Sequence, residues 1–132
     1  MNRIIHHLRS AIPIGAGITV TLALSVAGEW FLLHNAVLTL TLAKVVWYFA
    51  LLAALCGGYV TARLAARFPV QQAVAAGGLV ALLVTFITYS PGHSWWQAVV
   101  PGFAVAASMF IGAVLREWRR QMQTQRVDHA AE

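Results

Sequence analysis

Long apolar stretches, interrupted by short groups of charged residues, dominate the pattern along the chain. Residues 10–28, 45–62 and 68–115 form uncharged stretches of 19, 18 and 48 residues. A helix needs about 20 apolar residues to cross the hydrocarbon layer of a membrane, and the turn dipeptide Pro91-Gly92 divides the longest stretch in two. The pattern therefore predicts an all-α integral membrane protein whose four-helix transmembrane bundle occupies residues 1–115. The predicted spans are about 11–31, 40–64, 71–89 and 96–115.

The composition supports helices in a membrane and argues against a soluble globular enzyme. Of the 132 residues, 60% are apolar and 10% are charged, whereas a soluble domain is about half apolar and a quarter charged. Strands of a membrane barrel would alternate apolar and polar residues over about ten positions, and only residues 38–42 alternate here. We expect this segment to begin the second helix or to lie at the interface. We expect the first span to be retained, because its uncharged stretch is long for the core of a signal peptide.

The basic residues predict the orientation of the spans. Four spans place both termini and the turn at residues 64–70 on one side, together with eight of the nine lysine and arginine residues. Only Lys44 falls on the other side. Because lysine and arginine are enriched in cytoplasmic loops, both termini are predicted to be cytoplasmic. The eight residues are Arg3, Arg9, Arg63, Arg67, Arg116, Arg119, Arg120 and Arg126.

Small residues recur at four-residue spacing in every predicted span, as in the stripe from Gly15 to Ala27. Apolar burial does not drive helix association in lipid, so close contact between small residues must contribute. The paired glycines Gly57-Gly58 and Gly77-Gly78 predict a close backbone approach between the second and third spans. Alternatively, the same faces mediate contact between copies of the chain. The residues expected at helix contacts are Gly15, Ala54, Gly57, Gly58, Gly77, Gly78, Ser108 and Gly112.

Glu29, His34, Lys44 and His93 form a predicted polar cluster on the side opposite the termini. Glu29 is the only acidic residue in the first 116 positions, and a carboxylate in a membrane is a candidate functional group. Its place near the end of the first span favours an interfacial anchor or an ion pair with Lys44 over a coupling or ligand-binding role. Two histidines and a glutamate could bind a metal, but no H-x-x-x-H spacing supports such a site.

The polar tail, residues 116–132, carries one amphipathic feature. Leu115, Trp118 and Met122 lie at helical spacing among arginines, which predicts a basic continuation of the fourth helix on the anionic inner leaflet. Residues 121–132 are expected to be disordered, and no nucleic-acid role is needed to explain the charge. The residues expected to contact anionic headgroups are Arg63, Arg67, Arg116, Arg119 and Arg120.

One run in the second span resembles a known pattern. The segment from Trp47-Tyr48 through Gly57-Gly58-Tyr59-Val60-Thr61-Ala62-Arg63-Leu64-Ala65 is similar to small, uncharacterised four-helix proteins of the bacterial inner membrane, in which a Gly-Gly-aromatic run ends the second helix at an Ala-Arg pair. The resemblance implies the same location, the bacterial cytoplasmic membrane, and no catalytic residues. The chain differs from small multidrug carriers, whose essential glutamate lies well inside the first helix.

Two functions remain open from the sequence. No nucleophile motif, phosphate-binding loop or redox pair is present, so we expect neither catalysis nor a cofactor nor a metal. The favoured hypothesis is an accessory or assembly subunit that contacts itself or a larger membrane protein through its helices. The alternative is a small oligomeric channel, carrier or holin-like pore. A solvated path lined by Thr19, Thr85, Thr88 and Ser108 would favour transport, and a dry interior packed with alanine and glycine would favour assembly.

Overall fold

A computed structural model describes residues 2–35 and 40–132 of the chain. All regular structure in these residues is helical, and each of the four helices is long and apolar enough to cross a membrane. The predicted all-α chain with four helices of membrane-spanning length is therefore confirmed. Residues 36–39, which include part of the alternating segment 38–42, and the side chain of Arg3 lie outside the described part. The helices are α1 (Asn2–Asn35), α2 (Leu40–Leu64), α3 (Pro69–Thr88) and α4 (Trp95–Ala131).

Backbone features at the ends of α3 explain where this helix begins and ends. Pro69 lies in the first turn, where the helix needs no N–H donor, and Phe68 before it is left-handed with φ of 52°. The Tyr89 N–H donates to the Thr85 carbonyl at 2.9 Å and closes the helix. Gly92 follows with φ of 98°. Glycine adopts this conformation without strain, so the turn expected between the last two spans forms where the sequence places it.

Two helices are longer than the predicted spans. The first, α1, already begins at Asn2 and includes Pro13. The fourth, α4, continues to Ala131, so the prediction of disorder for residues 121–132 is wrong. No proline or glycine follows Gly112, and the arginine, glutamine and alanine residues of this segment favour helix even without a partner helix.

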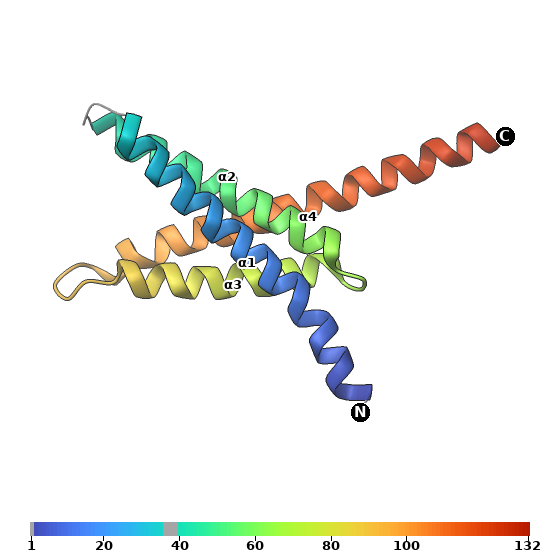
Figure 1. The fold of residues 1–132 in the computed structure, drawn as a ribbon, viewed down its shortest axis with the longest axis horizontal. Helices are drawn as coiled ribbons and strands as arrows, with labels where there is room; N and C mark the ends of the chain where they lie inside the picture. The colour runs from blue at the N-terminus through green and yellow to red at the C-terminus, as the bar shows by residue number, and fades with distance from the viewer. Residues whose placement is uncertain (1, 36–39) are drawn as a thin grey trace.

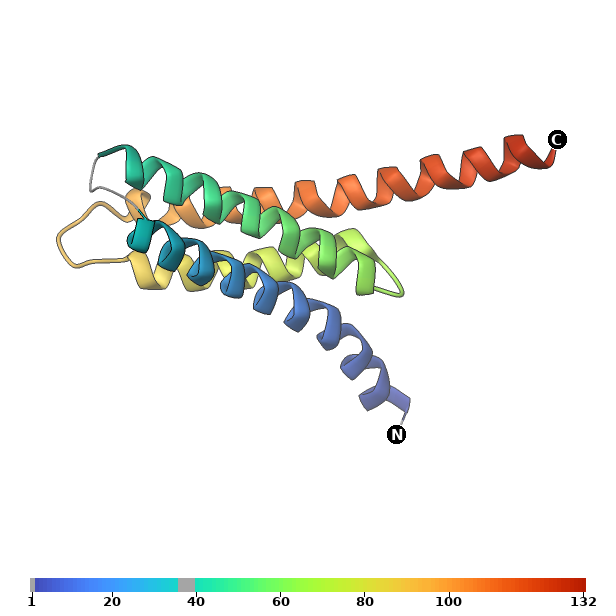
Figure 2. The same ribbon diagram turned by 45° about the horizontal axis from the view of Figure 1, so that its top comes forward.

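The four helices form a crossed bundle in which α2 is central. It packs along both α1 and α4, and α3 packs along α4, whereas the backbones of α1 and α4 do not approach each other in the described residues. Figures 1 and 2 show that the N-terminal part of α1 and the C-terminal part of α4 extend beyond the bundle at the same end. We call this end, where the 65–68 connection also lies, the basic end. Both α2 and α4 run towards this end, and they cross each other on the way (Figure 1).

Small side chains make up most of the core. One cluster of buried residues joins α2, α3 and α4, and Ile14, Ile18 and Val84 pack against it. A second cluster, nearer the basic end, consists of three alanines. Small side chains let helix backbones approach closely, which is how helices associate in lipid. The first cluster is Ala54, Ala76, Val80, Val105 and Met109, and the second is Ala62, Ala73 and Ala113.

Two threonines and two glycines interlock α1 and α2. The Thr21 hydroxyl donates to the Gly17 carbonyl in its own helix, and the Thr61 hydroxyl donates to the Gly57 carbonyl, each at 2.9 Å. Each threonine also packs against the glycine of the other helix, where a Cβ atom would overlap its hydroxyl. The same Gly-x-x-x-Thr unit thus occurs on both antiparallel helices, and each unit fits the other. The sequence reasoning singled out neither threonine nor Gly17.

The prediction that the paired glycines join α2 to α3 is wrong. Gly57 faces α1, and a Cβ atom there would lie 2.7 Å from the Gly17 carbonyl oxygen. Gly58 faces α4, where the backbone of Met109 fills the space of a side chain. Gly77 also faces α4, and its Cβ would lie 3.3 Å from the Ala106 Cα. Successive residues on a helix point about 100° apart, so Gly57 and Gly58 contact two different neighbouring helices.

Candidate functional site

Five hydroxyl groups in the bundle are bonded within their own helices. Thr21 and Thr61 are the buried polar side chains among the described residues, exposed by 3% and 0%. Of the residues named above for a solvated path, Thr19 and Thr88 are exposed and Ser108 is half-buried. Each of these three donates to the carbonyl four residues earlier, at 2.8, 2.7 and 3.0 Å. Within the described part of the bundle, the hydroxyls therefore line no continuous polar path.

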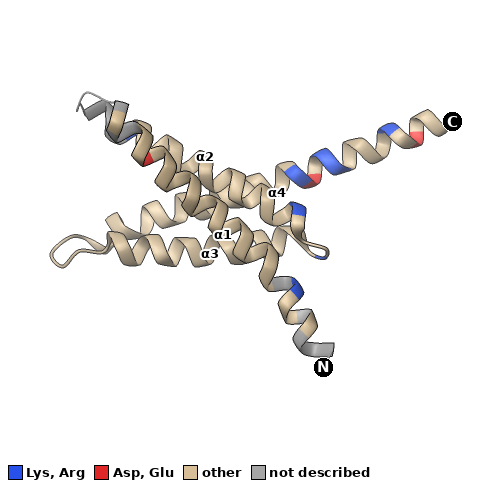
Figure 3. Ribbon diagram, viewed as in Figure 1, with Lys and Arg blue, Asp and Glu red and all other residues tan. Residues whose placement is uncertain are grey.

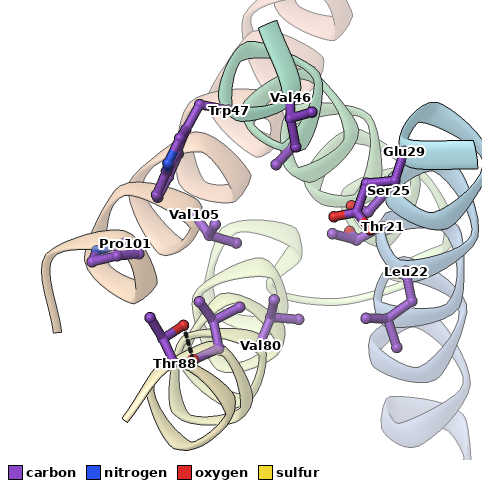
Figure 4. A pocket seen from close by; sticks show the side chains of 12 residues that line it. Thr21, Leu22, Ser25, Glu29, Val46, Trp47, Val80, Thr88, Pro101 and Val105 are labelled. Carbon is purple, nitrogen blue, oxygen red and sulfur yellow. Dashed lines mark hydrogen bonds between the residues drawn. The ribbon is translucent and has the colours of Figure 1, made fainter. Parts of the chain in front are cut away.

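An open cleft lies between all four helices in the half of the bundle away from the basic end. Its volume is about 320 Å³. Figure 1 shows α1 and α2 diverging from α3 and α4 towards this end, and Figure 4 shows side chains of all four helices around the cleft. One wall is polar, because Thr21, Ser25 and Glu29 follow each other at four-residue spacing on α1. The opposite walls are apolar and include Trp47 of α2 and Val105 of α4.

Glu29 is the one ionisable side chain among the described residues that line this cleft. Its side chain is exposed and lines the cleft beside Ser25. Lys44 is exposed as well, and the described side chains include no ion pair between Glu29 and Lys44. The helical spacing of residues 21, 25 and 29 was a signal available in the sequence. It places two hydroxyls and a carboxylate on one face of α1.

The two histidines of the predicted polar cluster lie in separate surroundings. The His34 ring packs on Trp30 within α1, with ring centroids 4.4 Å apart. His93 lies in the connection after α3 and lines a small pocket with Tyr89 and Gln97. No three histidine, cysteine, aspartate or glutamate side chains gather closely enough to hold a metal ion in the described part of the chain. The structure therefore does not join Glu29, His34 and His93 into one site.

A second, polar pocket lies at the basic end between α2 and α4. It has a volume of about 330 Å³, and four of its six lining side chains are arginines. The arginines are among those predicted to contact headgroups, whereas Arg67 of that group does not line the pocket. Tyr59 and Gln123 were not predicted, although they lie one helical turn from arginines of the site. We call this site the arginine pocket, and its residues are Tyr59, Arg63, Arg116, Arg119, Arg120 and Gln123.

Some of the small residues expected at helix contacts face outwards. Gly15 and Gly78 have no atom of another helix within 4 Å of a Cβ position, so the packing prediction is wrong for them within this chain. Inside the bundle α1 instead uses Pro13, Gly17, Thr21 and Gly28, which are buried. Gly78 lies in a shallow apolar groove between α3 and α4, with a volume of about 750 Å³. The groove is lined by Ala75, Gly78, Leu79, Ala81, Leu82, Thr85, Val99, Phe103 and Ala106.

Comparison of the chain with protein-family models, with curated protein sequences and with solved structures finds no match. The resemblance carried by the Gly-Gly-Tyr run of α2 therefore stays a prediction. The function must be inferred from the cleft, the arginine pocket and the exposed groove.

Proposed function

We propose that the protein is a non-enzymatic accessory or assembly subunit of a bacterial cytoplasmic membrane. It acts through contacts between its helices and those of a larger membrane protein or a second copy of the chain. The observation that carries the proposal is the interior, which is packed with alanine and glycine and lines no continuous polar path. In a bundle packed in this way, the exposed helix faces are the surfaces left for contact.

The proposed location rests on the distribution of apolar and charged residues. Four helices are apolar enough to cross a membrane, and Figure 3 shows arginine residues concentrated at the basic end, along α4 and near the 65–68 connection. Cytoplasmic loops are enriched in such residues. We therefore propose that all four helices cross the membrane and that both termini are cytoplasmic.

The groove between α3 and α4 is the proposed contact surface for a transmembrane helix. Its floor is made of small residues, including Ala75, Gly78 and Ala81, and Phe103 stands beside them, 74% exposed. A groove floored by glycine and alanine allows a neighbouring helix to approach closely, and in lipid such packing contributes to helix association.

The alternative function, a small oligomeric channel or carrier, is supported by the cleft that contains Glu29. The cleft is lined by all four helices, and an ionisable group facing such a cleft can mark a substrate path. The interior beyond it is closed by Val80, Val105 and Met109, which are 5% exposed or less. A path through a single chain would have to open this contact, so the assembly role is preferred.

Cross-linking in native membranes followed by purification in a mild detergent tests the proposal. We expect the protein to be recovered with a second copy or with a larger membrane protein. Gly78→Leu should reduce this recovery, because its side chain would occupy the groove, while its Cβ atom meets no other atom within 4 Å. Gly15→Leu is the size-matched control on α1, where a Cβ atom also meets no other atom within 4 Å. Recovery of the monomer alone, or equal recovery for both variants and the native chain, would contradict the proposal.

A further inference from the structure

The arginine pocket lies beside the point where α2 and α4 approach closely and cross (Figure 1). Gly112 of α4 lies against the Leu55 carbonyl of α2, and a Cβ atom there would be 3.1 Å from the Tyr59 nitrogen. One turn further towards the basic end, Arg63 of α2 and Arg116 of α4 line the pocket. Because α2 ends at Leu64 and α4 continues, the next turns of α4 extend the site.

The pocket holds positive charge without a compensating acid. None of its arginines forms an ion pair with a described side chain. Glu117 follows Arg116 directly, but it does not line the pocket, and its Oε2 atom is buried without a hydrogen-bond partner. Four guanidinium groups around one cavity repel each other, so an anion that carries more than one negative charge would stabilise the arrangement.

The donor groups in the pocket match the chemistry of phosphate. Each guanidinium presents N–H donors in a planar fork that fits two oxygens of a phosphate group. The Tyr59 hydroxyl and the Gln123 amide add uncharged donors. We propose that the arginine pocket binds a phosphate-bearing anion, held between α2 and α4. This site is distinct from the helix contacts of the proposed function and does not depend on them.

The position of the pocket makes a lipid headgroup one source of the phosphate. A helix rises 1.5 Å per residue, so the segment from Trp95 to Arg116 spans about 30 Å, the thickness of the hydrocarbon layer. With Trp95 and Trp96 at one interface, the arginines lie at the headgroups of the other leaflet. A soluble phosphate compound is the second source, since the pocket also opens on the side that faces away from the bundle.

Titration of the purified full-length protein tests the proposal. The probes are short-chain phosphatidylglycerol, with short-chain phosphatidylcholine for comparison, and inorganic pyrophosphate. Binding is followed by native mass spectrometry and by the fluorescence of Trp118, which is exposed beside the pocket on α4. Saturable binding of phosphatidylglycerol above that of phosphatidylcholine assigns the site to a headgroup. Saturable binding of pyrophosphate with equal or higher affinity assigns it to a soluble phosphate. Either result supports the proposal, and saturable binding of neither probe overturns it.

Two pairs of substitutions separate a defined pocket from diffuse attraction. R63Q/R119Q removes one guanidinium from each helix and should weaken the binding of the preferred probe about tenfold or more, because charge-assisted hydrogen bonds are lost. R67Q/R126Q removes the same charge outside the pocket and should change the affinity less than about threefold. Equal losses for the two pairs would overturn the proposal. R63K/R119K retains the charge and should still bind the probe more weakly, because lysine lacks the planar fork of arginine. If the glutamine pair does not fold, the affinity of this lysine pair tests the proposal.

Discussion

Replacement of Gly58 by alanine should separate α2 from α4. A Cβ atom at this position would overlap the Met109 carbonyl oxygen and lie 2.6 Å from the carbonyl carbon and 2.7 Å from the Cα. These are backbone atoms of a helix, so no side chain can rotate away. Carbon atoms pack at about 3.5–4.0 Å, and the two helices must therefore move apart by about 1 Å. The movement would loosen the contacts of Met109 and Ala54, both fully buried.

The expected loss follows from two opposing effects. Overpacking of a rigid core lowers the free energy of unfolding by about 1–3 kcal/mol, whereas alanine favours a helix over glycine by about 1 kcal/mol. Gly78→Ala is the matched control, since it gains the same helix propensity and meets no other atom within 4 Å. The difference between the two variants cancels the propensity effect and should be about 1–3 kcal/mol, with Gly58→Ala the less stable.

Thermal unfolding in a mild detergent measures this difference. The fraction of protein that elutes as folded after heating gives a melting temperature for each variant. We expect the melting temperature to fall for Gly58→Ala and to stay equal or rise for Gly78→Ala. Equal melting temperatures for the two variants would refute the close approach of α2 and α4 at Gly58.

Further predictions concern the topology, the cleft and the interlock of α1 with α2. With Cys56 replaced by serine, a cysteine at position 93 should react with an impermeant reagent added to intact cells, and a cysteine at position 67 should react only after lysis; the reverse pattern would contradict the orientation. Glu29→Gln should leave both the melting temperature and the recovery of partners unchanged, because Glu29 has no ion pair among the described side chains, and a loss of partners would instead support a binding role for the cleft. Thr61→Val should lower the free energy of unfolding by about 1 kcal/mol, the contribution of one hydrogen bond, and no change in the same heating assay would indicate that packing alone joins the helices.

The number of helices and the turns between them follow directly from the sequence. The signals are the uncharged stretches of 18 residues or more and the Pro91-Gly92 dipeptide. They depend on the local sequence alone, so they can be recognised without knowing which helices pack together. The ends of α1 and α4 were less predictable. The segments 2–10 and 121–131 are polar, and polarity predicts the end of a membrane span rather than the end of a helix. A helix without proline or glycine can nevertheless continue beyond its last residue that packs against another helix.

The faces by which the helices pack were not predictable from spacing alone. In α1 the stripe from Gly15 to Ala27 and the buried stripe that includes Gly17 and Thr21 both have four-residue spacing. An alanine-rich helix carries small residues on several faces, and only the partner decides which of them is used. The match between Gly17-Thr21 and Gly57-Thr61 selects the face. This match is a property of two segments 40 residues apart, so neither segment shows it by itself.

The interlock also limits where function can reside. Thr21 and Thr61 are the buried polar residues of the described chain, and their hydroxyls are already bonded to Gly17 and Gly57. These hydroxyls fix the contact of α1 with α2. If they donated hydrogen bonds to a solute instead, the bonds that hold the two side chains in place would be lost. Chemistry that needs free polar groups is thereby confined to the two ends of the bundle, the cleft with Glu29 and the arginine pocket. Between those ends the described residues offer apolar helix surfaces, and this supports the proposed role in assembly over one in conduction.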